Sequence, residues 1–579
     1  MAQERGRCRP EGPGRILVRA VWQRPGHLVA FAVASVLAAA TGLLLPQVLS
    51  QTIDTVLRHG GAPHALARLG VVVITSVAAQ AVAGLAGAAC VVGASVWLRR
   101  LMLQHIFALG PARSARFAPG DLINRLLGDA AQTAHALPVM AGIVLSLGTS
   151  LGGAIALWLI DPLLGLTLLA GLPPLVLLMR RFMAGSTDLH ARYERTFTSI
   201  VVRLSDALTG VRTIRAAGTT GREVHRVLAP LPELARTAQA TWQLQRQAVW
   251  KSMLLMPLME IAVLAVAGWA VAAGRIPPGE LVAAGAYVGI ALGAVGQVDA
   301  LMGLAAARAS VGRILEVLSL PAPVTADAPH PVPPKPGCIA FEAVTVRAGE
   351  QAVLDGIDLS VPAGTSLALV GRSGAGKSTL AALAGRLTDA DQGRVLLDGT
   401  DITHFDRAAL RDRVAYAFER PALFGDTVAD AIAYARPAAT RAEIEQAAIA
   451  ARADTFIQRL PEGYDTPLAK TPLSGGEAQR LGLARAVAQD ACVLVLDDAT
   501  SSLDTVTEAE VSRALAELFK DRTRIIVAHR ASTAARADLV AWLEEGCLRA
   551  VAPHAQLWDD PDYRAVFGTH PTAASEETS

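Results

Sequence analysis

The sequence predicts a multidomain protein: an all-α transmembrane domain with six spanning helices, followed by an α/β domain. Two observations predict this division. Long apolar runs fill the chain between residues 28 and 298, and short apolar strands alternate with helical stretches from residue 338 onward. With 579 residues, 52% of them hydrophobic, and a mean hydropathy of +0.38, the composition fits a membrane protein with a soluble part.

Six runs have the length and composition of membrane spans. They cover residues 28–53, 69–98, 136–160, 162–179, 252–274 and 281–298, and only Glu260 places a charge inside one. A span needs about 20 apolar residues. A signal peptide is the competing interpretation of the first run, but its apolar core would have only about 7–15 residues.

Arginines are concentrated on one side of the predicted membrane. They crowd the N-terminus, residues 99–125 and residues 180–246, whereas the intervening loops are short. Because excess positive charge marks the cytoplasmic side, we expect both chain ends inside. The two inside loops, residues 99–135 and 180–250, are long and helix-rich by pattern, which favours contact with something below the membrane.

The domain boundaries follow composition. The predicted transmembrane domain covers residues 1–320. Residues 321–337 hold seven prolines and form an extended linker, the α/β domain covers 338–567, and the small polar residues of 568–579 predict a disordered tail. The net charge of +2 gives no indication of a nucleic-acid partner, and the five cysteines show neither a disulfide framework nor metal-ligand spacing.

The first motif with a chemical role in the α/β domain is a phosphate-binding loop. The segment follows a short apolar strand, precedes a helix and fits the pattern G-x-x-x-x-G-K-[ST]: Gly371, Arg372, Ser373, Gly374, Ala375, Gly376, Lys377, Ser378 and Thr379. The glycines let backbone N–H groups turn toward a phosphate chain. Lys377 would reach the β- and γ-phosphates, and Ser378 would hold Mg²⁺. The competing interpretation is a chance glycine-rich turn.

Three later motifs carry groups suited to the same chemistry. Ser474, Gly475 and Gly476 precede a predicted helix over residues 478–488 and would form an anion site at its N-terminus. A buried strand over residues 493–496 runs into two carboxylates: Asp497 suits a water-mediated Mg²⁺ contact, and Asp498 stands where a general base would. His529 follows another apolar strand and would reach a γ-phosphate.

These motifs, in this order after six spans and a linker, resemble those of an ATP-binding cassette (ABC) transporter. The motifs are the P-loop, L-S-G-G-E, L-D-D-A-T-S-S-L-D and V-A-H-R. The chain looks most like an exporter half-transporter with fused membrane and nucleotide-binding domains, over residues 20–567.

The resemblance implies a multi-pass protein of the bacterial plasma membrane, with its N-terminus and nucleotide-binding domain in the cytoplasm. It implies a dimer that sandwiches two ATP molecules with Mg²⁺, each between one chain's P-loop and the other chain's signature. Asp504, which closes the L-D-D-A-T-S-S-L-D motif, is then expected to join the ATP-binding residues. The segment Gly120-Asp-Leu-Ile-Asn-Arg125 also resembles the family's pattern, in a loop expected to end in a coupling helix that docks on the cassette.

Four positions depart from the family. Ala348 stands where an aromatic residue would stack on adenine, and Glu419 replaces the glutamine that contacts Mg²⁺ and the attacking water. Asp498 replaces the catalytic glutamate and is one methylene shorter. The acidic segment before the signature is shortened to residues 468–472. The first three departures fall on the ATP site built on this chain's own P-loop, whereas the signature is intact.

The sequence therefore favours a heterodimeric exporter subunit that binds ATP but hydrolyses it poorly at its own P-loop, with Asp498, His529 and Glu419 as the catalytic positions. A slow homodimer with drifted positions is the alternative. Other hypotheses are an ATP-binding regulatory or scaffold subunit, and an importer built on the exporter scaffold. The substrate class stays open among small molecules, lipids and peptides.

Two acids near or within the spans are further candidates. Glu260 lies about 13 Å into the fifth span at 1.5 Å per residue, and Asp299 is near the inner end of the sixth. An acid within the membrane is a functional candidate, with a cationic or amphipathic substrate as one use. An interhelical hydrogen bond, or for Asp299 an interfacial position, explains them as well.

Overall fold

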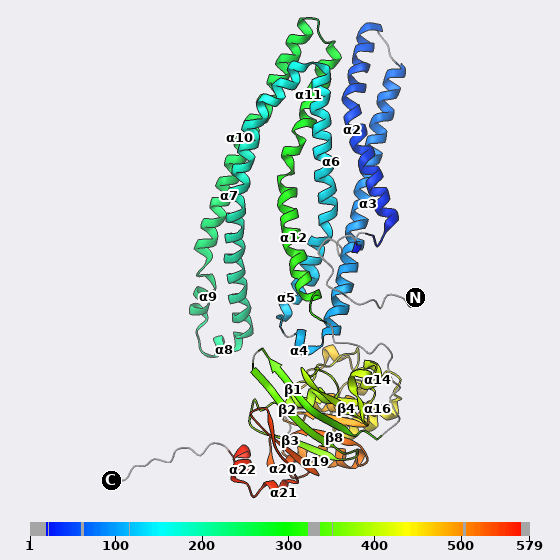
Figure 1. Ribbon diagram of the computed structural model, residues 1–579, viewed down its shortest axis with the longest axis vertical. Helices are drawn as coiled ribbons and strands as arrows, with labels where there is room; N and C mark the ends of the chain where they lie inside the picture. Colours follow the sequence, from blue (N-terminus) through cyan, green and yellow to red (C-terminus); the bar gives the residue numbers. More distant parts are fainter. Residues whose placement is uncertain are drawn as a thin grey trace, which may run out of the picture. The chain divides into compact units, whose positions relative to one another are not determined.

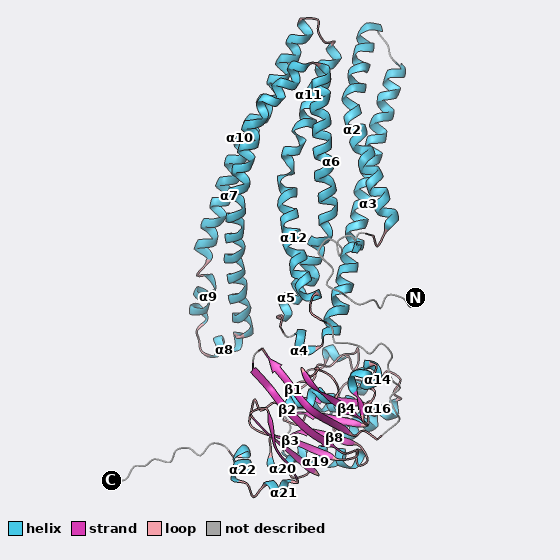
Figure 2. Ribbon diagram, in the orientation of Figure 1, coloured by secondary structure: helices cyan, strands magenta, loops and turns pink. Residues whose placement is uncertain are grey.

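The computed structural model describes residues 19–20, 22–59, 63–114, 116–321, 336–349, 351–501 and 505–568 (Figures 1 and 2). They form two compact units, one within residues 1–105 and 117–320 and the other within 106–116 and 321–579. Most of the predicted linker, the predicted tail beyond residue 568, and Asp504 lie outside the described residues.

Long helices make up the first unit (Figure 1). Those that carry the predicted spans are α2 (Pro25–His59), α3 (Pro63–Leu109), α6 (Ala130–Ile160), α7 (Pro162–Thr209), α10 (Leu231–Ala272) and α11 (Pro278–Leu292). Among the described residues, five helices are long and apolar enough to cross a membrane, and a shorter apolar segment, Pro162–Leu178, begins α7. Five of the six predicted spans therefore lie on one α-helix each, and the sixth begins on α11.

The sixth predicted span, residues 281–298, is not one continuous α-helix. Helix α11 ends at Leu292, the 3₁₀-helix η2 covers Gly293–Gln297, and α12 covers Val298–Leu318. Ser150 of α6 lies at the break: its hydroxyl donates to the carbonyl of Ile290 at 3.1 Å and accepts from the N–H of Ala294 at 3.0 Å. Glycines weaken an α-helix at this point, and Ser150 satisfies the freed backbone groups.

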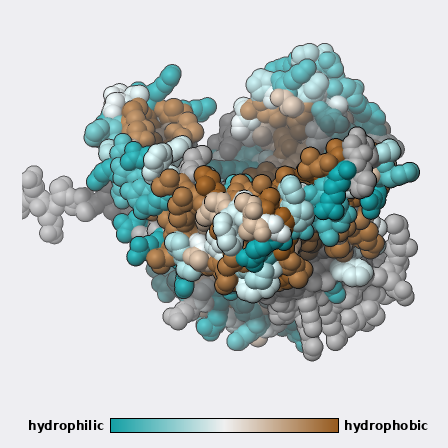
Figure 3. Space-filling model, turned by 90° about the horizontal axis from the view of Figure 1, so that it is seen from above, coloured by the Kyte–Doolittle hydropathy of each residue, from teal (hydrophilic) through white to brown (hydrophobic). Residues whose placement is uncertain are grey.

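The surface of these helices carries many exposed large apolar side chains. Ile74 is 70% exposed, Leu85 76% and Leu159 78%. In the view from above, hydrophobic residues lie at the surface between hydrophilic ones (Figure 3). Such apolar helix faces suit contact with lipid.

Helices α7 and α10 run side by side and continue beyond the spans (Figure 1). They are joined by α8 (Val211–Ala216) and α9 (Thr220–Leu228), in agreement with the helix-rich loop expected over residues 180–250. Gly171 permits their close approach, because a Cβ there would lie 2.6 Å from Cε of Met259. Small residues at such contacts are typical of membrane helix packing.

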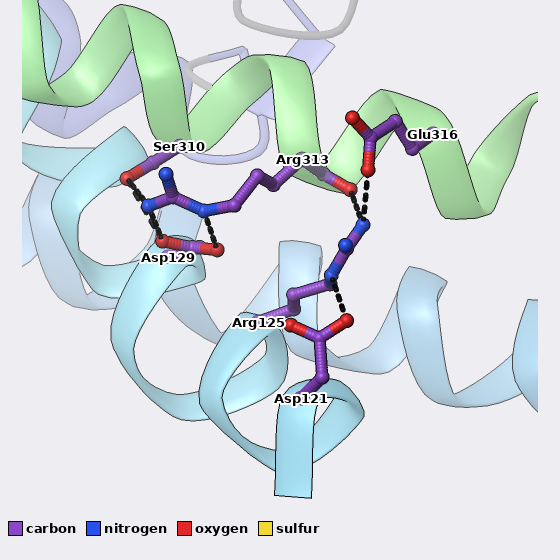
Figure 4. Close-up of polar contacts among 6 residues, drawn as sticks. All are labelled: Asp121, Arg125, Asp129, Ser310, Arg313 and Glu316. Carbon is purple, nitrogen blue, oxygen red and sulfur yellow. Dashed lines mark hydrogen bonds and ion pairs between the residues drawn. The ribbon is translucent and has the colours of Figure 1, made fainter. Parts of the chain in front are cut away.

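A polar network ties the segment after α3 to α12 (Figure 4). It joins α5 (Pro119–Asn124) and the π-helical turn η1 (Arg125–Asp129) to the last helix of the unit. Arg125 is buried; its Nε donates to Asp121 at 2.9 Å and its Nη1 donates to Glu316 at 2.8 Å. Within the segment 120–125, Asp121 and Arg125 form an (i, i+4) pair, and Arg125 also binds Glu316 of α12. These contacts give the acid and the arginine of that segment a structural role.

The second half of this network is centred on Asp129. Its carboxylate is buried and accepts from Nε of Arg313 at 2.8 Å and from the hydroxyl of Ser310 at 2.9 Å (Figure 4). A buried carboxylate needs such partners, because an unpaired charge is costly to bury. The network thus fixes η1 against α12.

The second unit contains two sheets. The first is antiparallel, in the order β2-β1-β4-β5, and the second has the order β10-β9-β3-β8-β7-β6. The strands are β1 (Ile339–Ala348), β2 (Gln351–Val361), β3 (Ser366–Val370), β4 (Gln392–Leu397), β5 (Thr400–Asp401), β6 (Val414–Phe418), β7 (Val493–Asp497), β8 (Thr523–Val527), β9 (Leu539–Glu544) and β10 (Cys547–Ala552). All neighbours in the second sheet are parallel except the β9–β10 pair.

The helices of this unit are mostly short. They are α4 (Pro111–Ser114), α13 (Lys377–Ala384), α14 (Arg407–Arg411), α15 (Val428–Ala433), α16 (Arg441–Ala450), α17 (Asp454–Ile457), α18 (Gly475–Ala488), α19 (Thr505–Leu518), α20 (Ala531–Ala534), α21 (His554–Leu557) and α22 (Pro561–Phe567), with 3₁₀ turns η3 (Ile402–His404), η4 (Gly463–Asp465) and η5 (Leu468–Lys470). Apolar cores lie on both faces of the second sheet, which is why strands such as β3 are buried at every position.

Residues 106–116 belong to the second unit, although the sequence placed them in the domain 1–320. Arg407 Nη1 donates to the carbonyl of Ala108 at 3.1 Å, and Arg113 donates to the carbonyl of Pro321. Such contacts join positions far apart in the chain, so a boundary drawn from composition could not place this segment.

Candidate functional site

The phosphate-binding loop connects β3 to α13. Gly374 and Gly376 have φ values of 85° and 91°, which favour glycine. At Gly376 no side chain fits, because a Cβ would lie 2.5 Å from Leu354 Cδ2 and 2.9 Å from the carbonyl oxygen of Val353. Arg372, Ser373 and Gly374 are exposed, whereas Ala375 and Gly376 are buried. The loop is therefore fixed at its base and open at its tip.

Lys377 fills the loop. Its side chain is buried, and Nζ donates to the carbonyls of Gly371 at 2.8 Å and Arg372 at 2.9 Å. Burial lowers the pKa of this ammonium group, and the carboxylates of Asp498 and Asp497 act in the opposite direction. The ammonium group is held where a bound phosphate chain would gain an ion pair.

Ser378 and Asp497 meet beside the loop. The Ser378 hydroxyl donates to Oδ1 of Asp497 at 2.8 Å. Burial raises the pKa of Asp497; the serine bond opposes this shift, and the nearby charges of Asp498 and Glu419 add to it. A cation at this point would offset the crowding of carboxylates.

The donor set fits Mg²⁺. Within the described chain, no three His, Cys, Asp or Glu residues group as metal ligands. Mg²⁺ usually takes only one or two protein oxygens and fills its other positions with water and substrate phosphates. A hydroxyl and a carboxylate, Ser378 and Asp497, are the partners such an ion uses.

Asp498 and His529 form the next pair. Asp498 Oδ2 lies 3.0 Å from His529 Nε2. The two side chains are 23% and 51% exposed respectively. Asp498 has a φ of 52°, a left-handed conformation that aspartate tolerates better than most residues. The sharp turn after β7 thus aims the carboxylate at the residue that follows β8.

Glu419 follows β6 and has no comparable anchor. Its side chain is 52% exposed, and its carboxylate lies 3.9 Å from Nε of Arg420. Its backbone carbonyl is fixed, because it accepts from Nε2 of Gln479 at 2.8 Å. Gln479 is buried and also donates to Ser501 at 3.0 Å. This role of Gln479 was not predicted from the sequence, although a glutamine on the buried face of the helix after the signature could have indicated it.

The signature segment caps α18. The N–H and the hydroxyl of Ser474 donate to Oε2 of Glu477 at 2.8 Å and 2.7 Å, and the Glu477 N–H returns a bond of 3.3 Å. This capping box starts the helix at Gly475, three residues before the predicted start. Ser474 and Gly475 are exposed and Gly476 is partly exposed. Within the described chain, the Ser474 side chain bonds only to Glu477.

The predicted residues thus divide into two places. The loop 371–379, Asp497, Asp498, His529 and Glu419 all follow or adjoin strands β3, β7, β8 and β6, whose carboxyl ends lie at one sheet edge. Polar groups at this edge are typical of ligand sites in parallel sheets. Ser474, Gly475 and Gly476 lie on α18 instead. Ala348 ends β1 in an exposed position.

Of the two acids predicted near or within the spans, the structure describes the side chain of Glu260. Glu260 is exposed on α10 and has no hydrogen-bond or ion-pair partner among the described residues. An interhelical hydrogen bond within the described chain therefore does not explain it. The side chain of Asp299 lies outside the described ones.

Comparison with known proteins assigns this architecture to a class. Residues 354–501 match the family model described as "ABC transporter", and residues 28–295 match that of the "ABC transporter transmembrane region". The chain belongs to the ABC transporter family, with fused transmembrane and ATP-binding domains of the exporter type.

Individual relatives match most of the chain. It is 43% identical to the ABC transporter ATP-binding protein RamA of Streptomyces coelicolor over 96% of this chain and 86% of the relative. It is 34% identical to an ATP-dependent lipid A-core flippase of Chromohalobacter salexigens, over 79% and 80% respectively. The structure of a bacterial Atm1-family ABC exporter with ATP bound is 25% identical and has a TM-score of 0.76, covering 94% of this chain and 98% of that one.

Proposed function

We propose that the chain is one subunit of a dimeric exporter that uses ATP to move a small or amphipathic substrate out of the cytoplasm. Family membership, the P-loop geometry and the similarity to a lipid A-core flippase support export. The substrate is a small molecule, a lipid or a peptide. The clustering of arginines on one side favours a bacterial plasma-membrane protein with its N-terminus and nucleotide-binding domain in the cytoplasm.

We assign the roles of the described residues from the geometry of the site, and that of Asp504 from family membership alone. Residues Gly371 to Thr379, with Asp504, would bind the nucleotide, and Ser378, Asp497 and Glu419 would face Mg²⁺. A bound Mg²⁺ would neutralise charge on the β- and γ-phosphates. Lys377 would exchange its loop carbonyls for phosphate oxygens, and Ser474, Gly475 and Gly476 would present a helix N-terminus to nucleotide on the partner subunit.

The single observation that carries the proposal of weak hydrolysis is the Asp498–His529 pair. The aspartate is one methylene shorter than the family's glutamate, and its carboxylate lies 3.0 Å from the histidine. A general base must reach the water whose proton it takes, and a misplacement of about 1 Å can cost on the order of 10²-fold in rate. We therefore favour a heterodimer whose partner supplies the competent catalytic glutamate.

Transport in proteoliposomes tests this function. The chain and the half-transporter that co-purifies with it are reconstituted, and ATP-dependent movement of a panel of labelled lipids and drugs is measured. We expect ATP-dependent movement of at least one compound, and stimulation of ATP hydrolysis by the same compound. ATP binding without movement of any panel member in either direction would contradict the exporter and favour a regulatory subunit; ATP-driven movement toward the cytoplasmic side would favour an importer.

A further inference from the structure

A pocket of about 460 Å³ lies between α7 and α10, outside the nucleotide site. One part of its wall is apolar and includes Leu177, Leu178, Leu254 and Leu255. Leu177 is 52% exposed and Leu254 64% exposed, so this wall opens to the surroundings of the helices. An open apolar wall on a membrane helix pair faces lipid chains.

The other part of the wall is polar and positively charged. It consists of Arg181 on α7 with Gln247 and Lys251 on α10. Within the described chain, neither cation has a carboxylate, carbonyl or aromatic partner, and both are exposed. Two other arginines of this unit are paired by contrast: Arg313 lies against Asp129, and Arg275 against Asp161. The pocket therefore presents two free cations and an amide donor beside an apolar surface.

The antiparallel packing of the two helices places these cations at one level. Gly171 of α7 contacts Met259 of α10. Because the helices are antiparallel, residue numbers increase along α7 and decrease along α10 in the same direction from this contact. Arg181 and Lys251 are ten and eight residues from that contact, or roughly 12–15 Å at 1.5 Å per residue. Both follow directly on the apolar spans, so they sit where a span meets its boundary. In the proposed topology this is the cytoplasmic boundary.

We propose that this pocket binds an anionic phospholipid of the cytoplasmic leaflet. Its phosphate lies between Arg181 and Lys251, the Gln247 amide donates a further hydrogen bond, and the start of an acyl chain rests on the leucine wall. Basic pockets between helices on the cytoplasmic side suit anionic headgroups, because charge attraction and apolar burial act together. The placement in the inner leaflet rests on the proposed topology, but binding itself requires no transport.

Native mass spectrometry of the purified full chain in detergent tests the site. The probe is phosphatidylglycerol, with phosphatidylcholine and inorganic phosphate as comparison ligands. Arg181→Gln with Lys251→Gln should weaken phosphatidylglycerol binding on the order of 10-fold or more, since each cation near the membrane surface attracts anionic lipid. The matched control is Arg180→Gln with Arg246→Gln, which removes the same charge at neighbouring exposed positions that do not line the pocket.

The expected pattern is specific. The control variant keeps wild-type affinity, phosphatidylcholine binds weakly to all three proteins, and millimolar inorganic phosphate fails to displace the lipid. Equal lipid binding by both double variants would overturn the proposal, and so would displacement by phosphate alone. Absence of any bound phosphatidylglycerol would also overturn it. An unchanged thermal unfolding midpoint in both variants shows that the fold is intact, and ATP binding, measured in parallel, separates this result from that of the proposed function.

Discussion

At the scale of single residues, Asp498 connects conformation to chemistry. The residue adopts a φ of 52° at the end of β7, and this turn directs its short carboxylate toward His529. A glutamate would extend the carboxylate by one bond from the same backbone position. The backbone at Asp498 therefore directs a carboxylate toward His529, and the shorter side chain limits how far that carboxylate reaches.

Lengthening this side chain should restore hydrolysis. Asp498→Glu is expected to raise ATP turnover at this site about 10-fold or more, because a small change of position has a large effect on a general base. Single-site turnover of bound ATP measures it. Asp497→Glu is the matched control and should lower turnover, since it displaces the carboxylate that accepts from Ser378. If Asp498→Glu gives no gain, Glu419 or Ala348 limits the rate instead.

The Asp497 carboxylate should lower the stability of the nucleotide-free protein and raise its stability when Mg²⁺ and ATP are bound. Burial raises the pKa of its carboxyl above the ordinary value, so the ionised form is disfavoured in the folded protein. As pH rises from about 4, the unfolded chain ionises first, and the cost to folding grows until the pH passes the folded pKa. Asp497→Asn should therefore stabilise the nucleotide-free protein at pH 7, and not at all near pH 4.

Thermal unfolding at several pH values without Mg²⁺ measures this effect. With Mg²⁺ and ATP present the order should reverse, since the wild-type carboxylate binds the cation and ligand binding adds stability. A destabilised Asp497→Asn protein at neutral pH without ligand would contradict the role given to burial.

At the scale of elements, hydrogen bonds and ion pairs hold the π-helical turn η1 against α12. Two of its three carboxylates differ strongly in burial: the Asp129 side chain is 5% exposed and that of Glu316 is 60% exposed. Buried ionic partners contribute more than solvated ones, because removing one leaves the other group without its hydrogen bonds.

Truncating these two acids should separate their contributions. Asp129→Ala is expected to cost about 2 kcal/mol, because Arg313 and Ser310 both lose their acceptor. Glu316→Ala should cost less than about 1 kcal/mol, as for other exposed pairs. Thermal unfolding of both variants in the same detergent compares them. Equal shifts would show that the network is not the stabilising contact described here.

At the scale of the whole molecule, the sequence predicts the elements better than their long-range contacts. Each proposed catalytic position follows an apolar strand, so its place at the sheet edge could be predicted from local pattern alone. Glycines favour the break before α12 locally, but the hydrogen bonds from Ser150 that accompany it could not be predicted, because Ser150 belongs to another helix. The contacts between η1 and α12 join residues more than 180 positions apart, and nothing in the local sequence of Asp129 indicates them.

The same limit explains the remaining differences. Gln479 holds the Glu419 backbone across 60 positions, and residues 106–116 belong to the second unit through contacts such as Arg407 to Ala108. The early start of α18 has a local cause, since the capping box of Ser474 and Glu477 satisfies N–H groups before the apolar pattern begins.

The central claim, that this chain holds ATP at one site and completes the competent site of its partner, is tested most directly by ATP turnover of the co-purified complex. We compare Ser474→Ala and Asp498→Ala, with Thr440→Ala as a control for Ser474, because Thr440 forms the same capping box on α16. Either cap loss should cost about 1 kcal/mol of stability.

We predict that Ser474→Ala lowers ATP turnover on the order of 10-fold or more, as expected for loss of a group that meets the transferred phosphate. Asp498→Ala and Thr440→Ala should leave ATP turnover nearly unchanged. Equal losses for Ser474→Ala and Asp498→Ala would contradict the claim and indicate two equivalent sites.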